Sequence, residues 1–120
     1  MDRPSFGQGL AVRETQSEGF LVIHVEESRL SAENAPVFQA HLMHRIAAGN
    51  DHIILDLATV ESIDQAGIDV MRTSLQVVEP EGDLVLCSIT EPVMEQLRQT
   101  LMNRMFGIFL SLDEAIDALT

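Results

Sequence analysis

Short apolar blocks alternate with amphipathic segments along most of the chain. Two blocks come first, residues 10–16 and 20–25, and the Ser-Glu-Gly turn between them predicts a β-hairpin. Residues 52–57 and 83–89 form two later blocks that are almost continuously apolar. Such runs are typical of central strands that are covered on both faces. A shorter apolar block at residues 108–110 predicts one more strand.

Four segments between and after these blocks have apolar residues at spacings of three and four, as on one face of a helix. Ser31 or Asn34 is expected to cap the first helix, which has Pro36 in its first turn and ends near Gly49. Thr90 is expected to cap the third helix. The four predicted inner faces are Ala35, Phe38, Leu42 and Ile46; Ile68, Met71, Leu75 and Val78; Val93, Leu97 and Leu101; and Ala115, Ile116 and Leu119.

The resulting order, β-β-α-β-α-β-α-β-α, predicts a mixed α/β fold. We expect a small, mostly parallel sheet of four to five strands with a hairpin-like edge at its N-terminal end and about four helices packed on it. Ser111 and Glu114 form a capping box that starts the last helix. We expect residues 1–9 to be a tail and residues 10–120 to be a single domain.

The composition narrows the classes of partner. The net charge of −12 argues against binding to nucleic acid or to an anionic membrane surface, because both rely on basic residues. A basic protein partner fits better, although the charge could also serve only solubility. No apolar run approaches the roughly 18 residues of a membrane span, so we expect no direct membrane insertion and a cytoplasmic location. The single cysteine, Cys87, agrees with a reducing compartment.

Enzyme motifs are absent from the sequence. There is no phosphate-binding loop of the Gly-x-x-x-x-Gly-Lys type, and Gly7-Gln8-Gly9 lacks the third glycine of a dinucleotide fingerprint. Cys87 lies inside a predicted strand with no adjacent basic residue, so we expect a buried, inert thiol. We therefore predict no catalytic residue and no cofactor.

Metal sites are also not expected. His41 and His44 lie three residues apart on the first predicted helix, and Glu33 or His24 are the only further ligands that come to mind. A metal site needs three or four converging ligands, so we expect surface or half-buried histidines instead. The acidic groups at residues 26–27, 79–83 and 113–117 lie at turns and caps, where carboxylates are solvated or favour a helix start.

The segment VESIDQAGIDVM, residues 60–71, contains a turn with a recognisable helix-capping pattern. Asp64 can cap the second helix by accepting hydrogen bonds from the backbone N–H groups of Ala66 or Gly67. Ile63 and Ile68 flank the cap as a hydrophobic staple. Gly67 is not explained by capping, since glycine near a helix start costs about 0.5–1 kcal/mol relative to alanine. Something must pack closely there, either a neighbouring element or a partner protein.

Three pieces of the chain together resemble the STAS domain family, the domain of anti-sigma-factor antagonists. They are RLSAENAPVFQ, HIILDLATVESIDQAGIDVM and GDLVLCSITEPVMEQL, and the resemblance extends over residues 10–119. It implies a small mixed sheet with helices on it and no catalytic role. At the first helix, Ser28 and Ser31 replace the family's Gly and Asp.

In the antagonists that the chain resembles, a Ser or Thr directly after the Asp of the turn is phosphorylated by the partner kinase, which is itself the anti-sigma factor. Gln65 occupies that position here, and Ala66 occupies the next. Glutamine cannot accept the phosphoryl group, so the resemblance implies no phosphorylation switch at Gln65. Ser62 and Thr59 lie nearby as weak substitutes.

The resemblance also implies where a partner binds. We expect an anti-sigma factor or a histidine-kinase-like ATPase to contact the Asp64 turn and the helix that follows it. The expected partner-binding residues are Ser31, Asp64, Gln65, Ala66, Gly67, Asp69 and Arg72, with Gln76 further along the helix. The alternative partner is a transport ATPase, for a STAS subunit of a membrane lipid ABC-transport complex. An enzyme or small-ligand binder is a third hypothesis, and homodimer formation stays open.

Overall fold

A five-stranded sheet forms the centre of the molecule. The structure is a computed structural model that describes residues 10–120, so the tail predicted for residues 1–9 lies outside the described residues. The strand order is β1-β2-β4-β6-β7, in which β1 and β2 are antiparallel and the remaining pairs are parallel. The strands span Val12–Ser17 (β1), Phe20–Val25 (β2), His52–Asp56 (β4), Asp83–Cys87 (β6) and Ile108–Phe109 (β7).

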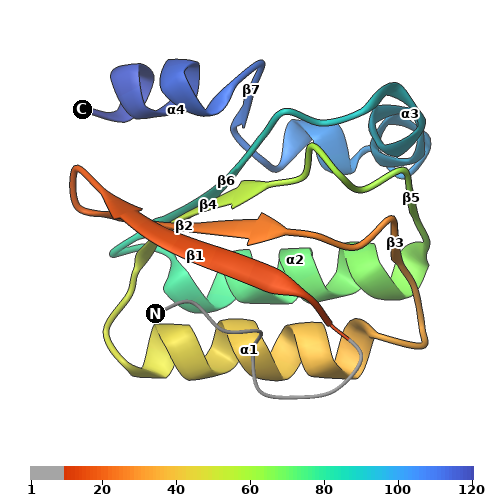
Figure 1. Cartoon of the computed structure of the whole chain (residues 1–120), viewed down its shortest axis with the longest axis horizontal. Coiled ribbons are helices and arrows are strands. Elements are labelled where there is room, and N and C mark those ends of the chain that lie inside the picture. The colour runs from red at the N-terminus through yellow and green to blue at the C-terminus, as the bar shows by residue number, and fades with distance from the viewer. Residues whose placement is uncertain (1–9) are drawn as a thin grey trace.

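Within residues 10–120, four α-helices cover the sheet unequally. They span Ala35–Ala47 (α1), Gln65–Val78 (α2), Glu91–Gln99 (α3) and Leu112–Leu119 (α4), with a short 3₁₀ turn, η1, at Met102–Arg104. In Figure 1, α1 and α2 lie side by side on one face of the sheet, whereas α4 lies on the opposite side near β7. The predicted mixed α/β fold, with its antiparallel edge hairpin and four helices, is confirmed.

The unequal covering divides the core into two parts. The larger cluster fills the space between the sheet and α1, α2 and α3, with Phe38, Leu42, Ile68 and Met71 completely buried in it. The smaller cluster lies on the other face, where α4 contributes the buried Ala115. Alternate residues of each strand point to opposite faces, which is why nearly continuous apolar blocks in β2, β4 and β6 supply both clusters.

The sequence did not predict a second, two-stranded parallel sheet. It pairs β3, Arg29–Leu30, with β5, Ser62–Ile63, and it lies just before the helices α1 and α2. Two-residue strands are too short to give a periodic pattern, so only the paired backbone shows them. This small sheet brings the segment before α1 against the turn before α2.

One predicted core position is wrong. Helix α3 ends at Gln99, and the Thr100 hydroxyl donates to the carbonyl oxygens of Gln96 and Leu97. Leu101 then adopts a left-handed backbone conformation, with φ of 62°, and its side chain is 57% exposed. The helical spacing placed Leu101 on the inner face, but the chain turns away before reaching it.

Two of the predicted helix caps differ from expectation as well. Asn34 occupies the N-cap position of α1, but its side chain bonds backwards, accepting from Ser31 N at 2.9 Å and donating to Arg29 O at 2.9 Å. Thr90 precedes α3 and donates instead to Val60 O at 2.7 Å. The cap predicted at Ser111 is confirmed, because its hydroxyl accepts from Glu114 N at 3.1 Å.

Candidate functional site

The Asp64 carboxylate joins the starts of two helices. Its Oδ1 accepts hydrogen bonds from Ala66 N at 2.9 Å and from Gly67 N at 3.2 Å, which caps α2 as predicted. Its Oδ2 accepts from Ala32 N at 3.1 Å, in the segment just before α1. The backbone N–H of Asp64 also donates to Leu30 O at 3.0 Å. One side chain therefore fixes the turn, the second helix and the approach to the first.

Gly67 is required by packing within the chain. A Cβ atom at this position would lie 2.9 Å from Ile63 Cγ1 and 3.1 Å from both Cβ and O of Leu30. Gly67 itself is buried. The question that the sequence left open is thus answered by a neighbouring element, the small β3–β5 sheet.

Gln65 lies on the exposed side of the same turn. Its Nε2 donates to Asp69 Oδ1 at 2.9 Å, one turn further along α2, and Arg72 Nη2 donates to the same oxygen at 3.3 Å. The hydrogen bond from Gln65 is the main cause that lowers the pKa of Asp69; partial desolvation opposes it and Arg72 adds to it. The first turns of α2 thus present an amide, a carboxylate and a guanidinium that hold one another in place.

A groove of about 660 Å³ runs between α1 and α2 and begins beside this turn. Its lining residues are Ala32, Ala35, Pro36, Gln39, Ala40 and Met43 on the α1 side, and Ala66, Asp69, Val70 and Thr73 on α2. Two residues predicted to bind a partner, Ala66 and Asp69, therefore lie in the groove. Sequence reasoning missed the groove itself, because its walls come from segments some thirty residues apart.

The other predicted residues do not line this groove. Ser31 is half-buried and directly precedes Ala32, which lines the groove, while Gln76 is exposed further along α2. Ser62, the weak substitute for a phospho-acceptor, is exposed on β5 opposite Arg29. Thr59 is exposed in the preceding loop. Partner binding and the absence of phosphorylation both stay predictions.

The two candidate metal ligands His41 and His44 both lie on α1. Within residues 10–120, no group of three or more His, Cys, Asp or Glu side chains could hold a metal ion. His41 is buried rather than surface or half-buried as expected, with its Nε2 2.6 Å from Glu14 Oε2. Arg45 Nε donates to the same oxygen at 2.8 Å. Burial lowers the pKa of His41, although the bond to Glu14 acts in the opposite direction.

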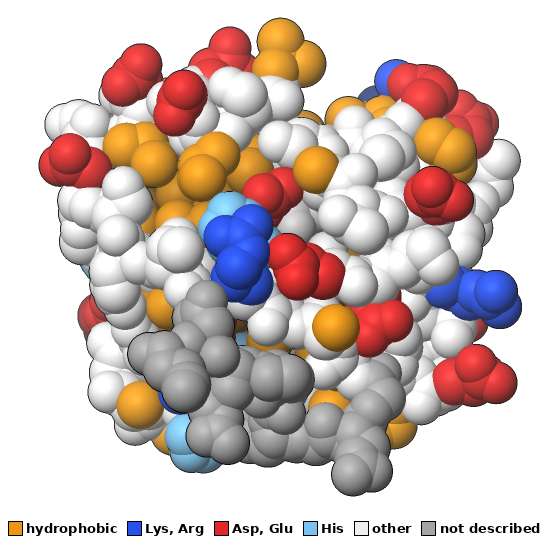
Figure 2. All heavy atoms as spheres, in the orientation of Figure 1, with side chains coloured by type: hydrophobic (Ala, Val, Ile, Leu, Met, Phe, Trp, Pro, Cys, Tyr) orange, Lys and Arg blue, Asp and Glu red, His pale blue; other side chains and the backbone are white. Residues whose placement is uncertain are grey.

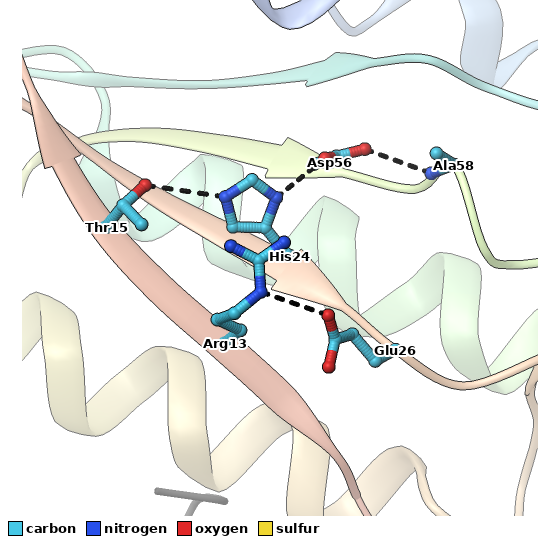
Figure 3. Close-up of polar contacts among 6 residues, drawn as sticks. All are labelled: Arg13, Thr15, His24, Glu26, Asp56 and Ala58. Atoms are coloured by element: carbon cyan, nitrogen blue, oxygen red, sulfur yellow. Dashed lines mark hydrogen bonds and ion pairs between the residues drawn. The ribbon is translucent and has the colours of Figure 1, made fainter. Parts of the chain in front are cut away.

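A second polar cluster joins β1, β2 and β4, and it was not predicted from the sequence. His24 Nδ1 is 2.7 Å from Asp56 Oδ2, and its Nε2 is 3.4 Å from Thr15 Oγ1 (Figure 3). Asp56 is held in turn by Ala58 N, which donates to Oδ1 at 3.1 Å. The available signal was that His24 and Asp56 are the polar residues near the ends of two apolar strands that pair in register.

This cluster has the order of a hydroxyl, an imidazole and a carboxylate, and it lies outside the α1–α2 groove. Thr15 is exposed on an edge strand, and none of the three residues lines the α1–α2 groove. Cys87 pairs with Asp56 across β4 and β6. Its burial, helped by the Asp56 charge, raises the pKa of its thiol to about 11, so it remains protonated at neutral pH.

The surface carries far more acidic than basic groups. The chain has 19 Asp and Glu residues against 7 Lys and Arg. Figure 2 shows acidic side chains spread over the visible face, with few basic ones between them and apolar side chains gathered at the upper left. Among residues 10–120, no helix is both long and apolar enough to span a bilayer.

Comparison with known proteins places this geometry in a family. The sequence profile of the STAS domain matches residues 11–115. A search of curated proteins finds no match. Among solved structures, a Thermotoga maritima protein assigned as an anti-sigma factor antagonist is 25% identical, with a TM-score of 0.80 over 89% of this chain and 92% of that one.

Two further structures, which are less similar in sequence, share the fold. An anti-sigma factor antagonist from Mycobacterium paratuberculosis is 16% identical, with a TM-score of 0.83 over 92% of this chain and 93% of that one. The murine anion transporter Slc26a9 is 18% identical, with a TM-score of 0.71 over 87% of this chain but only 18% of the transporter. The same fold thus occurs as a small protein and as part of a large transporter.

Proposed function

Because the chain belongs to the STAS domain family, we propose that it is a non-enzymatic protein–protein interaction module of the anti-sigma-factor-antagonist type. In this proposal it binds an anti-sigma factor or a histidine-kinase-like ATPase through the Asp64 turn and the start of α2. No phosphorylation at Gln65 regulates the complex. The match to the Thermotoga maritima protein supports this assignment over the other classes of STAS protein.

The observation that carries the proposal is the position of Gln65. It is exposed at the first residue of α2, beside the Asp64 cap, where a partner can reach it. Its amide nitrogen is engaged by Asp69 at 2.9 Å. An amide cannot accept a phosphoryl group, so the roughly two negative charges that phosphorylation adds cannot be placed here. The module is therefore always competent to bind, or is regulated at another position.

The experiment compares the wild-type protein with Gln65→Ser, using the purified cognate anti-sigma kinase and ATP. We expect no phosphate on residues 60–71 of the wild type and phosphate on the new hydroxyl of Gln65→Ser, measured by mass spectrometry. Phosphate on Ser62 of the wild type would contradict the absence of a switch. Failure of both proteins to bind the kinase would contradict the proposed class of partner.

Binding itself is tested with Gln65→Arg, which changes an exposed side chain. We expect it to weaken the complex by about tenfold. The longer side chain enters the contact, and its positive charge offsets the carboxylates of Asp64 and Asp69 that favour a basic partner. Asp64 and Gly67 are unsuitable for this test, since both support the fold through internal contacts. Unchanged affinity of Gln65→Arg would remove the turn from the interface.

A second candidate function is a STAS subunit of a membrane transport complex, including a lipid ABC transporter. It is favoured by the similarity to part of the Slc26a9 anion transporter and by a turn that needs no phospho-acceptor. In that case the partner is a transport ATPase. Co-purification with a permease complex rather than with a sigma-factor regulator would favour this candidate.

A further inference from the structure

The α1–α2 groove has the properties of a docking surface for a helix. Seven of its ten lining residues are apolar: Ala32, Ala35, Pro36, Ala40, Met43, Ala66 and Val70. Four of these are alanines, whose small side chains let another backbone approach closely. Met43 adds an adaptable side chain at the far end.

The groove is too open for a small polar ligand. Pockets for such ligands usually enclose most of the molecule and direct several polar groups at it. Here the polar lining residues are Gln39, Asp69 and Thr73, and Asp69 is already bonded to Gln65 and Arg72. An open groove lined mostly by small side chains is better suited to a segment of protein than to a small polar ligand.

The length of the groove fits about two turns of helix. Ala35 and Met43 are eight residues apart on α1, which corresponds to about 12 Å along the helix axis. Amphipathic helices bind such grooves through apolar residues spaced by three and four positions. Two turns supply two or three side chains of this kind.

Charge indicates the chemistry of the occupant. Three acidic residues lie at the end of the groove where α1 and α2 begin: Asp69 lines it, Asp64 accepts from the N–H of the lining residue Ala32, and Glu33 directly follows Ala32. Arg72 is already paired with Asp69 at 3.3 Å. The excess of carboxylates favours a segment that brings Lys or Arg side chains to this end and so improves electrostatic complementarity.

We propose that the groove between α1 and α2 binds a short, basic, amphipathic helix of the partner protein, with its basic residues beside the Asp64 turn. This inference rests on the proposed function, because it names the segment that such a partner inserts next to Gln65. Burial of apolar side chains in the groove supplies affinity, and the acidic end fixes the direction in which the helix lies.

Photo-crosslinking in an extract of the native cells tests whether a partner contacts the groove and identifies the segment that binds there. The photoreactive residue p-benzoyl-phenylalanine replaces Gln39, which is exposed and lines the groove. The matched control places it at Val77, which is 50% exposed on α2 and does not line the groove. We expect the Gln39 position alone to crosslink strongly, and mass spectrometry to identify a segment with helical apolar spacing and more Lys and Arg than Asp and Glu.

A charge pair at one position then tests the electrostatic part. The crosslinked segment, made as a synthetic peptide, is titrated against Ala40→Arg and Ala40→Glu, which add similar bulk with opposite charge. We expect the Arg variant to bind about tenfold more weakly than the Glu variant, because only the Arg repels a basic segment. The same pair at Val77 should differ by less than about threefold, since charges there are separated from the site and screened.

The outcomes separate this inference from the proposed function. A crosslinked segment that is acidic, a second copy of this chain, a phospholipid, or no crosslink above the Val77 control would each overturn the groove proposal. Equal binding by Ala40→Arg and Ala40→Glu would also overturn it. If any of these results came with loss of partner binding in Gln65→Arg, the proposed function would stand and only the groove would be wrong. Unchanged binding by Gln65→Arg would instead count against the proposed function.

Discussion

Asp64→Ala is expected to destabilise the protein by about 2 kcal/mol, and the structure divides this loss into two parts. Removal of Oδ1 leaves the backbone N–H groups of Ala66 and Gly67 without their cap. Loss of an N-cap carboxylate typically costs about 1 kcal/mol. Removal of Oδ2 also releases Ala32 N, a hydrogen bond near the surface that contributes about 1 kcal/mol more.

Asp64→Asn separates the two contributions. Asparagine caps a helix about as well as aspartate, so its oxygen can still accept from Ala66 N and Gly67 N. Its amide nitrogen is a donor and cannot accept from Ala32 N. We therefore expect a loss of about 1 kcal/mol, roughly half of the loss in Asp64→Ala.

Urea unfolding followed by circular dichroism measures both variants, and their free energies of unfolding are compared with that of the wild type. Ser111→Ala is the control, since Ser111 caps α4 through Glu114 N and makes no bridge to another element; about 1 kcal/mol is expected. Equal stability of Asp64→Asn and the wild type would refute the bridge to Ala32. Equal losses in Asp64→Asn and Asp64→Ala would refute the capping contribution.

Three other perturbations test the packing and the buried titratable groups. Gly67→Ala should lower the free energy of unfolding by about 1 kcal/mol in the same urea assay, because overpacking against Leu30 and Ile63 exceeds the gain in helix propensity; a more stable variant would contradict the contacts. The pKa of His41 is lowered by burial, so the unfolded chain binds more protons below about pH 6.5 and stability should fall as the pH falls there. His41→Gln should reduce that pH dependence in urea unfolding at pH 7.5 and 5.5, and an unchanged slope would argue against this role. Cys87, with its thiol pKa raised to about 11, should react with a thiol reagent at pH 7.5 only after unfolding; rapid labelling of the native protein would contradict its burial.

Most of the fold could be predicted from the sequence, because the spacing of apolar residues along the chain indicates each helix and each longer strand. The structure confirms the strand predicted from the apolar block at residues 52–57 and the helix predicted from the spacing of Ile68 to Val78. Both patterns depend only on which faces of the strand or helix are buried. The predicted burial of Leu101 was wrong because the spacing of apolar residues does not show where a helix ends. The β3–β5 pair was missed because two residues carry no period.

The candidate site was predictable in part, for a different reason. The cap at Asp64 involves residues two and three positions away, so local sequence was sufficient to predict it. Its bond to Ala32, the packing of Gly67 against Leu30 and the groove all join segments that are about thirty residues apart or more. Such contacts follow from how the small sheet sets α1 beside α2, and no single segment contains that information.

The contacts of the turn also explain why the residue at position 65 can change without loss of the fold. Asp64 directs its carboxylate to backbone N–H groups of its own chain, and Gly67 is buried against its own neighbours. The side chain of Gln65, by contrast, donates an exposed hydrogen bond to Asp69. Asp64 and Gly67 therefore specify the shape of the turn, whereas the exposed side chain of Gln65 is not needed for that shape. In the proposed function, the Asp-x-x-Gly frame supplies the geometry for docking, and the residue at position 65 decides whether the turn can accept a phosphoryl group.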